Sequence, residues 1–322
     1  MGFRLVCACM LVATACGGTT SESSTDGGVI DAGGDAAPSA CAEAKVPTLV
    51  AQVGPPGLNF IALDTQYVYA AGAAPDGQII RVPKCGGATE TLLSGIGAAL
   101  GVSVHSGEVY FVEQGPTAWE SRILRGPATG GAAQALAQDQ GSPWTVLVDG
   151  NGVYWANTFS NGINALPHGA STATELAWDR TRFAAFAADD SHLYFAGNQS
   201  MARVPKGGGA VEALAPADPE AWCAAVDEAY LYWTTYTGSV HRVSKIPGGA
   251  TFDYGLSGYH RCLVVDEAYV YVADDGFTAG VYRLPKSGGA AEKLHDGDAS
   301  SVAVDDSQLF WSGAGGLWRL AR

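Results

Sequence analysis

Three features of the sequence predict an all-β fold, a seven-bladed β-propeller. An Asp followed five residues later by an aromatic residue recurs at intervals of 38 to 44 residues, and a period near 40 with short strands is typical of propeller blades. Apolar runs such as Leu231-Tyr232-Trp233 show no polar alternation, which indicates strands buried on both faces. The composition, with 43 Gly and only 16% charged residues, is typical of a turn-rich β protein.

The repeat divides each copy into four predicted strands. The seven copies start at residues 64, 105, 149, 189, 227, 266 and 305. The inner strand carries small residues, as in "CAAV", and the Asp after it caps a tight turn by accepting hydrogen bonds from backbone N–H groups. The aromatic run follows, then a strand such as "GQIIRVPK", a "GG" turn and a more polar outer strand such as "TETLL". His105 replaces the Asp in the second copy.

The last copy supplies only three strands before the sequence ends at Arg322. We expect the missing fourth strand to come from Lys45–Val53, which closes the ring and removes an exposed sheet edge. Six blades with one copy discarded is the alternative, and it leaves an aromatic strand without a sheet.

The first 44 residues are predicted to be a targeting segment and a tether. Residues 1–15 contain Arg4 and then an apolar run that is too short to span a bilayer. Ala13-Thr14-Ala15 before Cys16 resembles the lipobox of bacterial lipoproteins, which implies acylation of Cys16; an ordinary secretory signal is the alternative. Residues 16–44, rich in Gly, Ser, Thr and Asp, are predicted to be a flexible tether, and residues 45–322 the propeller. By the same resemblance, Gly17 favours the outer membrane, on its periplasmic or exposed side.

The aromatic strands also resemble a known family of propellers. Tyr154-Trp155, Tyr232-Trp233-Thr234 and Phe310-Trp311, each after its Asp, resemble the YWTD repeat of low-density-lipoprotein-receptor-like proteins and the NHL and strictosidine-synthase-like propellers. No copy reads YWTD in full, and YWTD propellers usually have six blades. The sequence looks closest to propeller lipoproteins of Gram-negative bacteria, a resemblance that implies a fold and no particular function.

Four cysteines remain once the signal and the lipidation site are set aside. They are Cys41, Cys85, Cys223 and Cys262, an even number in an exported chain, which favours disulfides. Cys223 and Cys262 both lie four residues before their Asp in adjacent copies. Cys41 and Cys85 are expected at matching turns of the last and first blades. We therefore predict Cys41–Cys85 and Cys223–Cys262, with four free thiols as the alternative.

Charge and motifs exclude several functions. The net charge of −14 argues against nucleic acid or an anionic membrane surface as partner. The sequence contains no HExxH, Walker or GxSxG motif, so no catalytic residue, metal site or cofactor is predicted, although "DGNG" at Asp149 resembles half a calcium loop. The recurring Arg and Lys of "RVPK" are expected to lie near the Asp turns and pair with them. Residues that recur are scaffold, and function is expected where the copies differ.

The copies differ most at the rim opposite the Asp turns. Candidate ligand-binding residues there are Trp144, Arg182, Trp222, His260 and Arg261, because aromatic faces and cationic donors in a concavity suit a carbohydrate, peptide or protein ligand. The alternative is that the Trp side chains only cap the blades. The sequence thus predicts a monomeric, lipid-anchored binding module. Other possibilities are a lactonase- or lyase-type enzyme in which Glu220, Asp274 or Asp275 converges with His260, or a structural surface protein.

Overall fold

The computed structural model describes most of the predicted propeller. The described residues are 41, 44–53, 58–72, 77–160, 162–178, 185–197, 200–218, 220–313 and 315–322. The predicted signal segment, Cys16 and Arg182 lie outside them. Within them the secondary structure consists of β-strands, and no helix is long and apolar enough to cross a bilayer.

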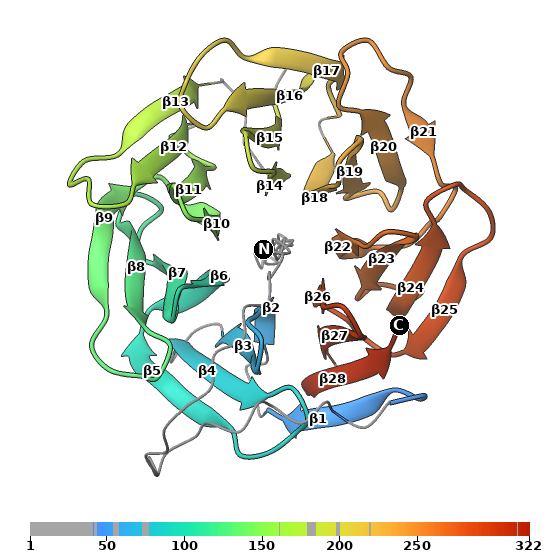
Figure 1. The fold of residues 1–322 in the computed structure, drawn as a ribbon, viewed down its shortest axis with the longest axis horizontal. Helices are drawn as coiled ribbons and strands as arrows, with labels where there is room; N and C mark the ends of the chain where they lie inside the picture. The colour runs from blue at the N-terminus through green and yellow to red at the C-terminus, as the bar shows by residue number, and fades with distance from the viewer. Residues whose placement is uncertain are drawn as a thin grey trace, which may run out of the picture.

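The chain forms seven four-stranded antiparallel sheets arranged as a ring (Figure 1). Blade 1 consists of β2 (Leu58–Leu63), β3 (Tyr67–Gly72), β4 (Gly77–Pro83) and β5 (Glu90–Ile96). Blade 2 consists of β6 (Ala98–His105), β7 (Glu108–Gln114), β8 (Ser121–Pro127) and β9 (Gln134–Gln140). Blade 3 consists of β10 (Pro143–Val148), β11 (Gly152–Asn157), β12 (Gly162–Pro167) and β13 (Thr174–Trp178). Blade 4 consists of β14 (Phe186–Ala188), β15 (His192–Ala196), β16 (Ser200–Pro205) and β17 (Glu212–Pro216).

The last three blades complete the ring. Blade 5 consists of β18 (Ala221–Val226), β19 (Tyr230–Thr235), β20 (Val240–Ser244) and β21 (Phe252–Asp253). Blade 6 consists of β22 (His260–Val265), β23 (Tyr269–Asp274), β24 (Gly280–Pro285) and β25 (Glu292–Asp296). Blade 7 consists of β26 (Ser301–Val304), β27 (Gln308–Gly313), β28 (Gly316–Ala321) and, from the other end of the propeller sequence, β1 (Thr48–Gln52).

The ring closes as predicted, through the N-terminal strand. β1 pairs antiparallel with β28, from Thr48 opposite Arg319 to Gln52 opposite Gly316, and so becomes the outermost strand of blade 7. The seven-bladed fold is therefore confirmed, and the six-bladed alternative is wrong because every copy of the repeat forms its own sheet.

Blade stacking explains why the aromatic strands lack polar alternation. Five of the six residues of β19 are buried, and Trp155, Trp233 and Trp311 are among the largest fully buried side chains. Trp233 also donates its indole N–H to Asp218 at 2.8 Å, which satisfies its buried polar atom. Each aromatic strand thus lies in the middle of a blade and packs against both neighbouring blades.

The two ends of the central channel differ in their connections. The Asp turns between the first and second strands and the turns between the third and fourth strands lie on one face, which we call the turn face. The loops between the second and third strands and the connections from one blade to the next lie on the other, which we call the loop face. This follows from the antiparallel order of the strands in every sheet.

The structure confirms one of the two predicted disulfides. Cys41 and Cys85 are bonded, which fixes the chain just before β1 to a turn of blade 1. The bond therefore staples the first blade to the last across the ring closure. The predicted Cys223–Cys262 bond is not formed. The two sulfur atoms lie 3.2 Å apart on the inner strands of blades 5 and 6, beyond the bonded length of about 2.05 Å.

Candidate functional site

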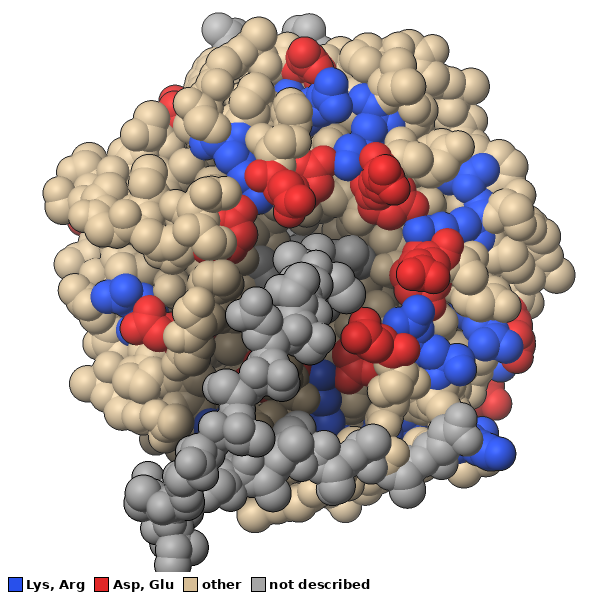
Figure 2. Space-filling model, viewed as in Figure 1, with Lys and Arg blue, Asp and Glu red and all other residues tan. Residues whose placement is uncertain are grey.

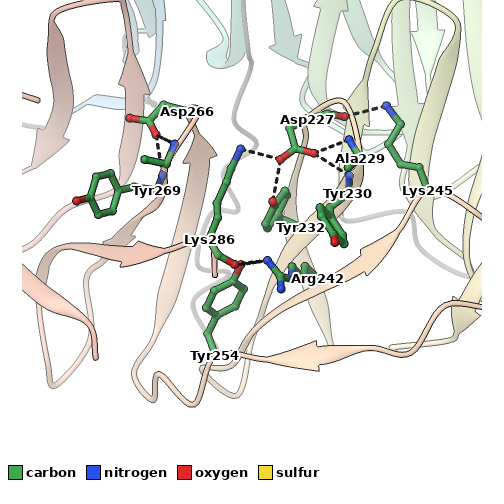
Figure 3. A network of polar contacts seen from close by, with 11 residues as sticks. Asp227, Ala229, Tyr230, Tyr232, Arg242, Lys245, Tyr254, Asp266, Tyr269 and Lys286 are labelled. Carbon is green, nitrogen blue, oxygen red and sulfur yellow. Dashed lines mark hydrogen bonds and ion pairs between the residues drawn. The ribbon is translucent and has the colours of Figure 1, made fainter. Parts of the chain in front are cut away.

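In six of the seven blades the turn after the inner strand is built around an Asp carboxylate. In blade 5, Oδ1 of Asp227 accepts hydrogen bonds from the backbone N–H groups of Ala229 and Tyr230 at 2.8 and 2.7 Å. Its Oδ2 accepts from the hydroxyl of Tyr232 at 2.8 Å (Figure 3). The five-residue spacing of the repeat therefore has a direct cause, because the tyrosine hydroxyl bonds back to the Asp that caps the turn.

The same carboxylates join neighbouring blades. Lys286 of blade 6 reaches Oδ2 of Asp227 in blade 5 at 2.6 Å (Figure 3). Five of the seven seams between blades have such a pair: Lys84–Asp305, Lys206–Asp149, Lys245–Asp189, Lys286–Asp227 and Arg322–Asp266. We call this set the seam pairs. They are partly buried, so each also orients two blades relative to one another.

The predicted pairing of the recurring "RVPK" motif is right for Lys and wrong for Arg. Arg81, Arg203 and Arg283 pair with Glu90, Glu212 and Glu292 of the outer strand in their own blade. Strand register explains the difference, because Arg81 lies directly opposite Glu90, whereas the Lys lies beyond the strand end and can extend to the next blade.

Two seams lack the pair, and they are adjacent. In blade 2, Ala128 occupies the place that Lys has in other blades, so Asp64 of blade 1 has no Lys across its seam. At the next seam both members change, because His105 replaces the Asp and His168 replaces the Lys. Their rings stack with centroids 6.0 Å apart and planes 13° from parallel. Blades 1 to 3 therefore differ chemically from the rest of the ring.

The seam environment shifts the pKa values of several of the turn Asp and Tyr side chains. Burial alone raises the pKa of a carboxyl group, but the Lys ammonium and the backbone N–H donors outweigh it. The pKa is consequently lowered for Asp149, Asp189, Asp227 and Asp305. Burial, reinforced by the Asp carboxylate, raises the pKa of Tyr69, Tyr154, Tyr194, Tyr232 and Tyr271.

These shifts predict a stability plateau bounded on both sides. The lowered carboxyl pKa values contribute stability above pH ~4 that is lost as the pH falls, because the unfolded chain then binds more protons. The raised tyrosine pKa values contribute stability below pH ~10 that is lost as the pH rises. Above that pH each such tyrosine lowers the free energy of unfolding by up to ~1.4 kcal/mol per pH unit. Urea unfolding between pH 3 and 12 measures both limbs. Tyr232→Phe, which places the residue that blade 7 already has as Phe310, should flatten the alkaline limb; an unchanged slope would contradict the assignment.

A cavity occupies the centre of the turn face. Its larger part has a volume of about 1590 Å³ and extends from the turns of blades 1 and 2 to those of blades 5 to 7. A smaller part of about 650 Å³ lies against blades 3 to 5, and the two share His105, Asp227 and Glu228. Ten acidic and six Lys or Arg residues line them together, so the lining has an excess of negative charge.

The negative charge is concentrated on one side of the cavity. In blades 4 to 7 a second acidic residue follows the turn Asp: Asp190, Glu228, Glu267 and Asp306, all exposed. Thr65, Ser106 and Gly150 occupy this place in blades 1 to 3. Figure 2 shows the acidic side chains gathered around the central opening on the side of blades 4 to 7 and sparse over blades 1 to 3. We call these four residues the acidic half-rim.

The predicted ligand residues lie on the loop face, away from this cavity. Trp222 of blade 5 contacts Tyr236, which contacts Tyr259, and the guanidinium of Arg261 lies over the Tyr259 ring. Trp144 is in blade 3, two blades away, and Arg182 lies outside the described residues. Neither part of the cavity is lined by Trp144, Trp222 or Arg261. The predicted ligand residues therefore do not belong to the turn-face cavity.

The residues of the alternative enzymatic interpretation partly come together. Nδ1 of His260 lies 2.9 Å from Oδ2 of Asp274, and Arg261 donates to Asp275 at 2.6 Å. Both the His260 and Asp274 side chains are fully buried. Asp274 also accepts from the backbone N–H groups of Tyr259 and Gly276, a set of contacts that orders the loop between β23 and β24. Among the described residues no group of three or more His, Cys, Asp or Glu is placed to hold a metal ion.

Sequence reasoning missed the cavity and its acidic half-rim. The signal was present in the dipeptides at the turns, which read Asp-Asp or Asp-Glu in blades 4 to 7 and Asp-Thr, His-Ser and Asp-Gly in blades 1 to 3. The recurring Asp of these turns indicates a scaffold role. The residue directly after it is the one that distinguishes the copies.

Known structures resemble the chain in fold alone. No protein-family model and no curated protein matches the sequence. A streptogramin B lyase structure aligns over 85% of this chain and 96% of its own with a TM-score of 0.69 and 14% identity. The WD40 propeller domain of Doa1 aligns over 85% and 96% with a TM-score of 0.66 and 12% identity. A chain of a nidogen/laminin complex aligns over 69% and 89% with a TM-score of 0.54 and 17% identity. The class that fold and comparisons define is therefore the β-propeller.

Proposed function

We propose that the protein is a binding module whose turn-face cavity takes a polycationic ligand, with ammonium groups spaced along a flexible chain. The acidic half-rim is the observation that carries this proposal. Its four carboxylates are exposed. Glu228, Glu267 and Asp306 line the larger part of the cavity, of about 1590 Å³, and Asp190 lines the smaller part, of about 650 Å³. Among the described residues none of the four is paired with a cation. A cleft lined by one sign of charge concentrates ligands of the opposite sign.

The seam pairs support the proposal because they show which acidic residues are structural and which are available to a ligand. Asp227 is held by Lys286, its own backbone and Tyr232, whereas the neighbouring Glu228 is free to bind. The turn Asp therefore fixes the position of the adjacent acid on a rigid turn. A site on a rigid scaffold loses little conformational entropy on binding.

We propose further that the module is exported and anchored to the outer membrane through a lipid on Cys16. The lipobox-like sequence before Cys16 and the following tether support this. So does the Cys41–Cys85 bond, because disulfides persist in oxidising compartments. Cys16→Ser should move the protein from the membrane fraction to the soluble exported fraction; retention in the membrane fraction would contradict the anchor.

Calorimetric titration with spermine and with tetralysine tests the ligand class. We expect binding that weakens as salt is added, and at least a 10-fold loss of affinity when the half-rim is neutralised by Asp190→Asn, Glu228→Gln, Glu267→Gln and Asp306→Asn. The comparison of the two probes distinguishes a polyamine from a basic peptide tail.

A matched variant controls for the overall negative charge. Asp139→Asn, Glu175→Gln, Asp253→Asn and Asp296→Asn remove the same charge from exposed strand residues outside the cavity and outside the loop-face connections. Affinity should fall much less in this variant than in the half-rim variant. Equal losses in both would mean non-specific attraction and would overturn the proposed site.

A further inference from the structure

Several exposed aromatic side chains lie on the loop face. Among the described residues, the exposed large aromatics include four in loops between the second and third strands of blades 2, 3, 5 and 6: Trp119, Phe159, Tyr236 and Phe277. Tyr236 is half exposed and Phe277 is fully exposed. Exposed apolar side chains that are scattered singly need no explanation, whereas contiguous ones mark interaction sites, so the aromatics that contact one another are the informative ones.

At the seam of blades 5 and 6 these aromatics join a packed row. The ring centroids of Trp222 and Tyr236 are 5.4 Å apart, and those of Tyr236 and Tyr259 are 5.0 Å apart in an edge-to-face arrangement. We call these three residues the aromatic row. The guanidinium of Arg261 lies 5.4 Å from the centre of the Tyr259 ring at its end. Trp, Tyr and Arg are the residues in which binding energy concentrates at protein interfaces.

The backbone holds this row rigidly. The N–H of Tyr236 donates to the carbonyl of Glu220 at 2.7 Å, and the N–H of Tyr259 donates to Asp274 at 2.7 Å. Gly276 packs so closely on Tyr259 that an added Cβ would lie 2.3 Å from the Tyr259 Cβ. The rings are therefore positioned before any partner arrives.

Three buried polar atoms in and beside the row lack hydrogen-bond partners among the described residues: Nε1 of Trp222, the hydroxyl of Tyr259 and Oδ1 of Asp275. Leaving such an atom without a hydrogen bond costs about 1–3 kcal/mol. All three atoms are shielded from solvent, so the part of the row that a partner reaches is the half-exposed ring of Tyr236.

The charge of the face points to a basic partner. Its described connections between strands carry Glu120, Asp218, Glu220, Asp275 and Asp298 and no Lys or Arg. Burial raises the pKa of Asp275, Arg261 lowers it, and the neighbouring carboxylates of Asp274 and Asp298 raise it further. An additional cation would reduce the electrostatic repulsion between these carboxylates. An exposed tyrosine ring is also a favourable site for a Lys or Arg side chain, which binds over its face.

We propose that the loop face docks a basic segment of a partner protein, with a Lys or Arg side chain over Tyr236 and within reach of Asp275. The site is separate from the turn-face cavity and rests on different residues. One molecule is then able to hold a cationic ligand at one end of its channel and a protein at the other.

Peptides selected from a phage-displayed library of random 12-residue sequences provide the probe. The library is first depleted on the double variant Tyr236→Ala/Phe277→Ala and then selected on the wild-type propeller. We expect enriched sequences to contain Lys or Arg. Their affinity should fall at least 10-fold on Tyr236→Ala and on Asp275→Asn, and should change little on Trp119→Ala, which lies in blade 2 of the same face.

The design separates this proposal from the proposed function. The half-rim variant should keep full affinity for the selected peptides. A loss of polycation binding alone would therefore not affect the proposal for the loop face. Failure to enrich any peptide, or enrichment of peptides insensitive to Tyr236→Ala, would overturn the proposal. Binding of an oligosaccharide panel that is lost on Tyr236→Ala, with no peptide enriched, would replace the protein partner by a glycan and equally overturn it.

Discussion

Asp227→Ala is expected to lower the free energy of unfolding by about 3 kcal/mol, because the carboxylate has three kinds of partner. It caps its turn through Ala229 and Tyr230, accepts from the buried Tyr232 hydroxyl and pairs with Lys286 across the seam. The substitution leaves a buried hydroxyl and a partly buried ammonium without an acceptor. Urea unfolding followed by tryptophan fluorescence measures the loss.

Asp64→Ala provides the matched control. Asp64 caps its turn through Gln66 and Tyr67 and accepts from Tyr69, but Ala128 stands where other blades have Lys. The loss should therefore be smaller than at Asp227 by roughly 1 kcal/mol, the contribution of one partly exposed ion pair. A double-mutant cycle of Asp227→Ala with Lys286→Met should give a coupling energy of the same size. Equal losses at Asp64 and Asp227, with no coupling, would mean that the seam pairs do not join the blades.

Removing the Cys41–Cys85 bond is expected to cost about 4 kcal/mol by the chain-entropy relation for a loop of this length. The two residues are 44 positions apart, and the bond holds the segment that leads into β1. Without it, blade 7 is closed by the backbone pairing of β1 with β28 alone. The double variant Cys41→Ser/Cys85→Ser should unfold at lower urea and lose hydrogen-exchange protection in β1 first.

Reduction separates this effect from the substitutions themselves. Dithiothreitol should remove the hydrogen-exchange protection of β1 in the wild type and leave the protection of β1 in the double variant unchanged. Cys223→Ala tests the other cysteine pair and should not reproduce the loss of protection in β1. Uniform loss of protection over all blades in the double variant would contradict a role in ring closure.

The fold could be predicted from the sequence because each recurring residue has a structural role. The five-residue spacing of Asp227 and Tyr232 reflects a hydrogen bond between their side chains, which recurs in most blades. The small residues of "CAAV" fill the crowded inner strands. The closing strand could also be predicted, because the last copy of the repeat lacks a strand and the segment that contains Thr48–Gln52 could supply it.

Contacts between blades were harder to predict than contacts within a blade. The Lys286–Asp227 pair spans 59 residues, so its partners cannot be matched without knowing how far each side chain reaches beyond its strand. The same holds for blades 2 and 3, where His105 replaces the Asp and His168 replaces the Lys. This joint replacement can be recognised only once the two histidines are known to face each other. The sulfur atoms of Cys223 and Cys262 were placed together correctly, but proximity did not decide whether a bond forms.

The loop-face candidates illustrate a different limit. Trp222 and Arg261 were selected because they depart from the repeat, and the structure joins them through Tyr236 and Tyr259. Tyr259 directly precedes His260 and Arg261 in the sequence and is found with them. Tyr236 lies in a connection of variable length that has no fixed position in the repeat, so periodicity could not identify it.

Mapping amide chemical shifts of the ¹⁵N-labelled protein during a tetralysine titration tests the central claim most directly. The claim is that the acidic half-rim of the turn-face cavity binds polycations. It predicts that the largest shifts fall on the turns that carry Asp190, Glu228, Glu267 and Asp306, with small shifts at Thr65, Ser106 and Gly150. A titration that leaves the amides of these four turns unshifted, wherever else shifts fall, would contradict it.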